Sequence, residues 1–467
     1  MSTGEGTGAG RSRLGVASAA LVALGALAAS VAWVGGSPTA GLAGRWVLIA
    51  GLVLWALRRR SLTAWILFSM VVGAEVGNDW PQTAVAMRLL SQIFIRMIKT
   101  IIAPLLFATL VVGIAGHPNL RHVGRMGIKA LVYFEVVTTL ALFIGLAAIN
   151  LTRAGIGVVP PEGLQPTGVS APKQTISDVI LHSFPENVAK SVAEGQVLQI
   201  VVFSVLFAIA LSLLSDERRR PMLAFAESLA ATMFKFTNLV MLFAPVGVGA
   251  AIAYTVGHMG LGILVNLAKA LATFYLALLS FLLLVLLPIA LLAKVPVRRF
   301  LKAIAEPVSI AFATTSSEAA LPLAMERMEE FGVPRQTVAF VMPTGYSFNL
   351  DGSTLYLALA SVFVAQAAGI HLSFGQQLMI VFTLMITSKG VAGVPRAVLV
   401  ILMGTASSFG LPEWPILALL GIDELMDMAR TSVNVIGNCL ATVVIARWEG
   451  EYPPPVGEEA ASRSQGK

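Results

Sequence analysis

Charge and cysteine are both scarce in this sequence. Asp, Glu, Lys and Arg make up 12% of the 467 residues, whereas 57% are hydrophobic. Soluble domains carry about twice that charged fraction, so the composition predicts a polytopic membrane protein. Cys439 is the single cysteine and the five histidines are scattered. No disulfide can form within the chain, no cysteine-based metal site is available, and no cofactor is expected.

The short motifs of common enzyme classes are also missing. The sequence contains no His-Glu-x-x-His zinc motif, no Gly-x-Ser-x-Gly elbow and no phosphate-binding loop, which argues against an intramembrane enzyme. Its basic residues lie in short loops between apolar runs. That pattern is typical of topology signals and contact with anionic membrane lipid, and it argues against nucleic-acid binding.

Apolar runs account for most of the chain. Residues 1–13 form a polar tail. The run 14–34 is either a signal peptide or a retained helix, and its length of about 20 residues favours the helix. A second helix forms if the apolar residues 41–44 and 46–57 are joined across Arg45. Together the two runs predict an extra N-terminal helical hairpin at 14–60. Further predicted spans are 62–76, 89–116, 130–149, 198–214, 221–254 and 263–293.

The basic clusters indicate an orientation. If the spans alternate strictly, every cluster falls on the same side of the membrane, as the positive-inside rule requires. Both termini are therefore expected in the cytoplasm, and the long loop 150–194 is expected outside. The clusters are Arg11, 58–60, 121–129, 218–220 and 294–302.

Two later apolar stretches are interrupted by small residues. The first, 304–328, is broken at 314–322, and the second, 376–403, is broken at 387–396. Irregular backbone at membrane depth is tolerated only against protein or a watery cavity, so both are predicted to be re-entrant helical hairpins. Each precedes a polar-marked helix, the first at 338–368. The two units predict an inverted repeat, the arrangement in which transporters bind substrate near the bilayer midplane.

The second polar-marked helix, predicted at 411–448, carries an ionic face. Spacings of four, three, four and four residues place its polar side chains within an arc of about 80°. Because charges inside a bilayer are costly, such a face predicts a binding site. The alternative is that this face packs against another helix and is stabilised by an ion pair between Asp423 and Arg430. The polar residues of this face are Asp423, Asp427, Arg430, Asn434 and Asn438.

Four ordered motifs resemble those of the dicarboxylate/amino acid:cation symporters, which include the glutamate transporters. The motifs begin at Ser316, Asn349, Gly390 and Asp427, and the likeness covers about 61–452. Bacterial proton-coupled glutamate/aspartate symporters are the most similar subgroup.

The resemblance implies an all-α, inverted-repeat, elevator-type homotrimer in the plasma (inner) membrane. It implies eight spanning helices, two re-entrant hairpins and the extra N-terminal pair. The scaffold and first six core helices would occupy 61–293 and the transport core 294–448. Residues 449–467 would form a disordered tail.

In this family the arginine at the position of Arg430 binds the substrate's side-chain carboxylate, and the aspartate at the position of Asp427 binds its amine. Dicarboxylate carriers typically have a serine at the latter position, so the resemblance favours glutamate or aspartate over a C4-dicarboxylate. Both substrate classes, and a receptor or channel, remain alternatives. The implied substrate-binding residues are Ser316, Ser317, Ser353, Val394, Asp427, Arg430, Thr431 and Asn434.

The cation sites depart from the sodium-coupled pattern. Asn438 replaces an aspartate, and Lys389 places an ammonium where another sodium ion would be held. Both changes favour protons as the coupling ion, with sodium at Asn349 and Asp351 as the alternative. Glu135 and Glu318 are candidate proton carriers, because burial raises a carboxyl pKa. The implied coupling residues are Glu135, Thr138, Thr139, Glu318, Ser347, Asn349, Asp351, Ser388, Lys389, Asp423, Asn434 and Asn438.

Overall fold

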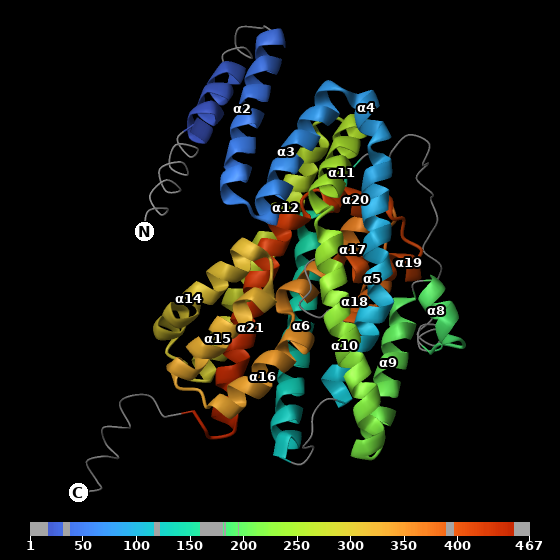
Figure 1. Cartoon of the computed structure of the whole chain (residues 1–467), viewed down its shortest axis with the longest axis vertical. Helices are drawn as coiled ribbons and strands as arrows, with labels where there is room; N and C mark the ends of the chain where they lie inside the picture. The colour runs from blue at the N-terminus through green and yellow to red at the C-terminus, as the bar shows by residue number, and fades with distance from the viewer. Residues whose placement is uncertain are drawn as a thin grey trace, which may run out of the picture. The chain divides into compact units, whose positions relative to one another are not determined.

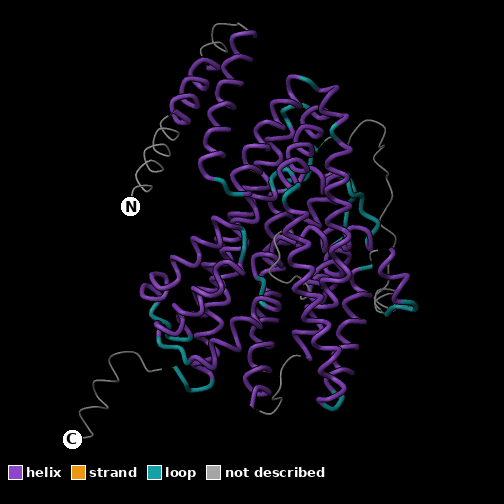
Figure 2. The backbone as a smooth tube through the Cα atoms, viewed as in Figure 1, coloured by secondary structure: helices purple, strands orange, loops and turns teal. Residues whose placement is uncertain are grey.

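The computed structural model of the chain describes residues 17–30, 38–115, 122–158, 181, 184–194, 196–388 and 397–452. Across these ranges the regular structure is helical, with no strand (Figures 1 and 2). The tails at 1–13 and 453–467 and the site residues Lys389 and Val394 lie outside them. Contacts divide the chain into two units, Met1–Ile95 with Val240–Ile263, and Arg96–Leu239 with Leu264–Lys467.

The first unit contains the N-terminal helical hairpin, formed by Ala17–Ser30 and α2 (Pro38–Arg59). Arg45 lies inside α2, as predicted. The unit also includes α3 (Leu62–Asp79), α4 (Pro81–Ala86), the start of α5 (Arg88–Ala115) and α11 (Ala244–Met259). Small residues let α3 and α11 pack backbone to backbone: a Cβ on Gly77 would meet the Ala253 carbonyl oxygen at 2.7 Å.

One polar cluster links α2 to α3. The Arg45 guanidinium donates to Asp79 at 2.7 Å and to Glu75, while the Trp46 ring N–H donates to Asp79 at 3.3 Å. A guanidinium on an apolar helix is costly unless it is paired. The cluster therefore fixes the N-terminal hairpin against α3.

The second unit contains the remaining helices. It begins with the rest of α5, then α6 (His122–Thr152), α8 (Val188–Glu194), α9 (Val197–Ser212), α10 (Asp216–Met241, all but its end), α12 (Ile263–Phe281), the π-helical turn Leu282–Leu286 and α13 (Leu287–Leu292). It continues with α14 (Val297–Thr314), α15 (Ser317–Phe331), α16 (Arg335–Phe348), α17 (Asp351–Ala367), α18 (Phe374–Thr387), α19 (Ala397–Ser408), α20 (Trp414–Leu420) and α21 (Asp423–Trp448).

Burial separates the inner helices of this unit from the outer ones. In Arg335–Ala367, 94% of the most apolar window is buried, and in Asp423–Trp448 the share is 89%. In Ile263–Leu292 it is 33%. Helices α17 and α21 therefore form the centre of the unit, and their polar residues face protein.

The described residues contain six helices that are long and apolar enough to span a membrane, or seven with the bent pair α10–α11. The chain is thus an all-α polytopic membrane protein. Three other predicted spans do not meet this measure. Helix α3 ends in the polar residues Glu75, Asn78 and Asp79, and both Ala17–Ser30 and α9 are too short. The count of eight stays a prediction.

Three predicted boundaries were wrong. The stretch 338–368 is not one helix but two, separated at Asn349–Leu350. The stretch 411–448 likewise breaks before Asp423. In the first hairpin the interruption is only Thr315–Ser316, because Thr315 takes a left-handed conformation (φ 51°) and the Ser316 hydroxyl caps α15, which continues through Pro322.

Candidate functional site

The site is built where the start of α17 meets the middle of α21. The two helices approach closely because glycine stands at the contact. A Cβ on Gly352 would overlap the backbone carbonyl oxygen of Arg430, and one on Gly437 would overlap the Asp351 carboxylate. This close approach brings the backbone break at Asn349–Leu350 against the polar face of α21.

Arg430 is fully surrounded by protein, with 1% of its surface exposed. Its Nε donates to Asp427 Oδ1 at 2.9 Å, and its two terminal nitrogens donate to the Asp423 carboxylate at 2.8 and 3.4 Å. Its guanidinium carbon lies 4.7 Å from the centre of the Tyr356 ring, a cation–π contact. The Thr431 hydroxyl also donates to Asp427 Oδ1, at 2.9 Å.

The ion pair between Asp423 and Arg430, the packing alternative considered for this face, is thus present. It does not account for the whole face. Asn434 lies one turn beyond Arg430 and binds the other helix: its Oδ1 accepts from the backbone N–H of Gly352 at 2.8 Å, and its Nδ2 donates to Ser353 Oγ at 3.0 Å. Asn434 therefore caps α17, satisfying N–H groups that its first turn leaves unpaired.

The cation-site residues form a second buried group one turn further along α21. Asn349 donates from Nδ2 to Asn438 Oδ1 at 3.2 Å and to Asp351 Oδ2 at 3.4 Å. Asn349 Oδ1 and Asn438 Nδ2 are buried and have no hydrogen-bond partner among the described residues. The predicted set of Asn349, Asp351 and Asn438 is thus brought together.

The hairpin tips are only partly described. Ser317 is buried at the start of α15, Ser316 caps that helix, and Glu318 is exposed. Ser388 follows α18 and is buried, and its hydroxyl has no hydrogen-bond partner among the described residues. The rest of the second tip, with the predicted site residues Lys389 and Val394, lies outside the described residues.

The remaining predicted residues lie on α6 and α16. Thr138 is buried and donates to the backbone carbonyl of Phe134 at 2.6 Å, a bond within its own helix. Glu135 and Thr139 are half-buried. The side chain of Ser347 lies outside the described part of the chain.

Charge is unevenly distributed in the interior. The buried charged side chains in the described ranges are four carboxylates and one guanidinium: Asp351, Asp423, Glu424, Asp427 and Arg430. Sequence reasoning missed Glu424, because its side chain lies about 80° from the centre of the polar face and outside the arc of the other polar residues.

The model of the sodium:dicarboxylate symporter family matches residues 62–448. The chain belongs to this family. It is accordingly a membrane transporter and not an enzyme. The match begins after the N-terminal hairpin, so the hairpin is an addition to the family's core.

Named relatives are similar over most of their length. A proton/glutamate-aspartate symporter of Escherichia coli is 42% identical over 411 residues, covering 83% of this chain and 93% of the relative. A proton/sodium-glutamate symport protein of Bacillus subtilis is 39% identical, covering 86% and 96%. A C4-dicarboxylate transport protein of Solibacter usitatus is 40% identical, covering 87% and 99%.

Proposed function

We propose that the chain is a secondary active symporter that imports glutamate or aspartate together with protons. The observation that carries this proposal is the buried pair of Asp427 and Arg430 on α21. An acidic amino acid carries two carboxylates and one ammonium group. A binding site for it needs one fork-shaped cation and one anion at a fixed spacing, which these two side chains supply.

Substrate binding replaces existing contacts in this proposal. Every nitrogen of the Arg430 guanidinium donates to Asp423 or Asp427. A substrate carboxylate that takes over part of the guanidinium leaves Asp427 to accept from the substrate ammonium. Asp423 continues to hold the other edge of Arg430, which makes it a positioning residue. Thr431, Asn434, Ser353 and the hairpin tips complete the shell.

The residue at position 438 supports coupling to protons. Asn438 supplies an amide next to Asp351 where a further carboxylate would favour sodium.

The wider arrangement follows the family. The transport core at 294–448 moves across the membrane against scaffold helices within 61–293, and the two hairpins act as gates. The chain forms a homotrimer in lipid of the plasma (inner) membrane, with both termini in the cytoplasm. This orientation is predicted from the positions of the basic clusters. Labelling either terminus from outside the cell tests it.

Uptake by proteoliposomes tests substrate and coupling. Labelled glutamate, aspartate and succinate are offered under an imposed pH gradient without sodium. Accumulation of the two amino acids under an inward proton gradient is expected. A strict requirement for sodium would disprove proton coupling. Uptake of succinate alone would favour the alternative of a C4-dicarboxylate carrier. The relative from Solibacter usitatus is named as such a transport protein.

The proton carrier can be identified among three carboxylates. Glu135 is half-buried, Glu318 is exposed and Glu424 is buried. Replacing the carrier with glutamine removes the pH dependence of net uptake while leaving exchange of internal for external substrate intact. A variant that loses both activities has a damaged binding site, so the two readouts separate the roles.

A further inference from the structure

Helix α21 ends in a turn that directs the chain back toward neighbouring helices. The Gly450 N–H donates to the Arg447 carbonyl oxygen at 3.0 Å, and the Glu451 N–H donates to the Ala446 carbonyl oxygen at 2.9 Å. Gly450 takes a left-handed conformation (φ 76°), which glycine adopts without strain because it has no Cβ. The turn lies just beyond the residues that the family model matches. Its role therefore does not follow from membership of the family.

Glu449 and Glu451 fasten this turn to two other helices. Lys129 on α6 lies 2.7 Å from the Glu449 carboxylate and donates to the Trp448 carbonyl oxygen at 2.8 Å. A lysine at this position also interacts favourably with the negative end of the α21 dipole. The buried hydroxyl of Thr337 on α16 donates to the Glu451 carboxylate at 2.6 Å. The end of α21 is thus bonded to both α6 and α16.

Tyr452 makes a third connection, to the first hairpin formed by α14 and α15. Its ring stacks on Phe331 at the end of α15, with ring centres 5.8 Å apart and planes inclined by 20°. The Arg299 guanidinium on α14 lies 5.2 Å from the centre of the Phe331 ring, and that of Arg447 lies 5.3 Å from the centre of the Tyr452 ring. Two Arg447 nitrogens are buried without a hydrogen-bond partner among the described residues, so the Tyr452 ring offsets part of the cost of burying them.

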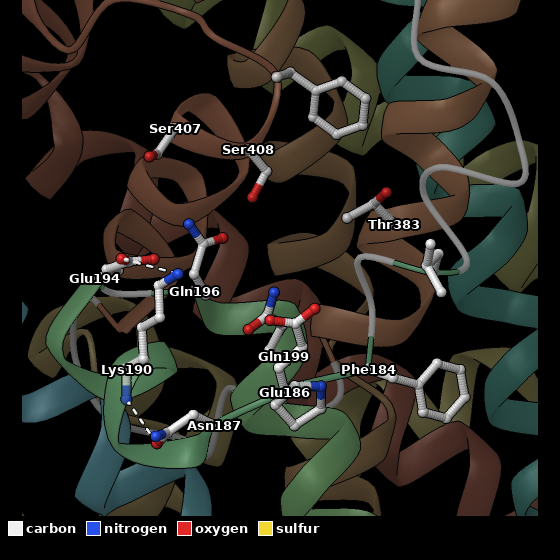
Figure 3. Close-up of a pocket in the computed structure, with 13 residues that line it drawn as sticks. Phe184, Glu186, Asn187, Lys190, Glu194, Gln196, Gln199, Thr383, Ser407 and Ser408 are labelled. Atoms are coloured by element: carbon white, nitrogen blue, oxygen red, sulfur yellow. Dashed lines mark hydrogen bonds and ion pairs between the residues drawn. The ribbon is translucent and has the colours of Figure 1, made fainter.

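The clasp formed by Glu449, Glu451 and Tyr452 is more enclosed than an ordinary surface ion pair. The Glu449 side chain is 7% exposed. In the polar cavity beside α8, by contrast, Lys190 and Glu194 lie 3.9 Å apart and both side chains are at least half exposed (Figure 3). Exposed pairs contribute little to stability, whereas removing one partner of an enclosed pair is costly. The clasp therefore resists separation of the helices that it joins.

We propose that this clasp positions the first hairpin for transport by fixing the base of the hairpin to α21 and α6. While the clasp holds, α15 and α16 cannot leave α21 at this end. The hairpin then moves at its tip, where Ser316 and Ser317 lie, and not at its base. This role rests on the proposed function, which places the tip in the substrate shell. A loosened base adds conformations that substrate binding must remove, and this lowers the affinity.

Hydrogen exchange measured by mass spectrometry on the purified full chain tests the clasp without any substrate. Tyr452→Ala is expected to speed exchange at the end of α15 roughly tenfold, because the stacked ring opposes local opening there. Tyr452→Phe keeps the ring and should exchange like the parent chain. Phe225→Ala on α10 is the matched control, because it removes an aromatic ring that is 56% exposed. Unchanged exchange in α15 would overturn the proposal, and so would equally faster exchange in α17, which would indicate global destabilisation.

A milder pair of variants tests the ionic contact. Glu449→Gln removes the charge that faces Lys129, and Glu194→Gln makes the same change in the exposed pair with Lys190. Faster exchange is expected at the start of α6 in Glu449→Gln, whereas α8 should change little in Glu194→Gln. No change at α6 would remove Glu449 from the clasp and contradict its part in the proposal.

Uptake of labelled glutamate by proteoliposomes tests the positioning role. Tyr452→Ala is expected to raise KM roughly fivefold while the maximal rate stays within about twofold, because the hairpin is less ordered before substrate binds. Tyr452→Phe should restore the KM of the parent chain. Faster exchange with an unchanged KM would overturn the positioning role and leave the proposed function intact. Absence of glutamate uptake by the parent chain would instead contradict the proposed function, and the exchange experiment would still decide whether the clasp exists.

Discussion

The side-chain amide of Asn349 donates to Oδ1 of Asn438 across 3.2 Å, linking the backbone break before α17 to the middle of α21. The same amide donates to Asp351 Oδ2 at 3.4 Å. An aspartate at 438 would therefore be separated from the Asp351 carboxylate only by the side-chain amide of Asn349. Two carboxylates at that separation repel each other unless a cation lies between them.

Asn438→Asp is accordingly expected to make uptake respond to sodium. Carboxylate and carbonyl oxygens are the ligands that hard cations prefer, and the variant supplies one more of them. We expect sodium to stimulate glutamate uptake in the variant at neutral pH and to have little effect on the parent chain. Initial rates in proteoliposomes with sodium or choline outside provide the measurement.

Asn187→Asp is the matched control for this substitution. Asn187 Oδ1 accepts from the backbone N–H groups of Ala189 and Lys190, and an aspartate oxygen can do the same. Asn187→Asp adds the same negative charge, but away from the group formed by Asn349, Asp351 and Asn438. Equal sodium stimulation of both variants would show that the effect is not local to Asn438.

Arg430→Lys separates the shape of the cation from its charge. Lysine keeps the positive charge between Asp423 and Asp427 but cannot offer a planar fork. Loss of two charge-assisted hydrogen bonds corresponds to about 3 kcal/mol, or roughly a hundredfold rise in the KM for glutamate. Arg447→Lys, near the end of the same helix, should leave KM unchanged. An unchanged KM in Arg430→Lys would contradict the role of the fork.

Asp427→Ser tests which group selects the amine. The Asp427 carboxylate accepts from both Arg430 and Thr431, so serine there frees part of the guanidinium and removes the partner for an ammonium group. The ratio of succinate to glutamate uptake is expected to rise at least tenfold. Competition assays on the same vesicles measure it, and a ratio that does not change would remove Asp427 from the selection of substrate.

The sequence was most informative along α21. Spacing alone predicted that Asp423, Asp427, Arg430 and Asn434 share a face, because helical periodicity fixes which side chains lie together. Spacing could not predict their partners. The capping of α17 by Asn434 and the pairing of Asn349 with Asn438 depend on how two helices far apart in sequence pack.

The backbone breaks and Glu424 show why other features were missed. Residues 338–368 were predicted to form one polar-marked helix, yet the chain turns at Asn349–Leu350, where α21 supplies hydrogen-bond partners from outside the segment. Glu424 lies off the polar face and is nonetheless buried. Its burial follows from α21 being enclosed on all sides, which composition does not reveal.

The close approach of α17 and α21 gives a last prediction. A methyl group at Gly352 would overlap the Arg430 carbonyl oxygen, so Gly352→Ala must separate the two helices. Overpacking of this kind costs about 1–3 kcal/mol, and here it also moves Arg430 away from Ser353.

Gly375→Ala on α18 is the matched control, because a Cβ there meets nothing within 4 Å and alanine favours a helix. Thermal unfolding in detergent should show a lower Tm for Gly352→Ala and an unchanged or higher Tm for Gly375→Ala, with glutamate uptake lost only in the former. Full uptake by Gly352→Ala would mean that the spacing of these two helices does not set the geometry of the site.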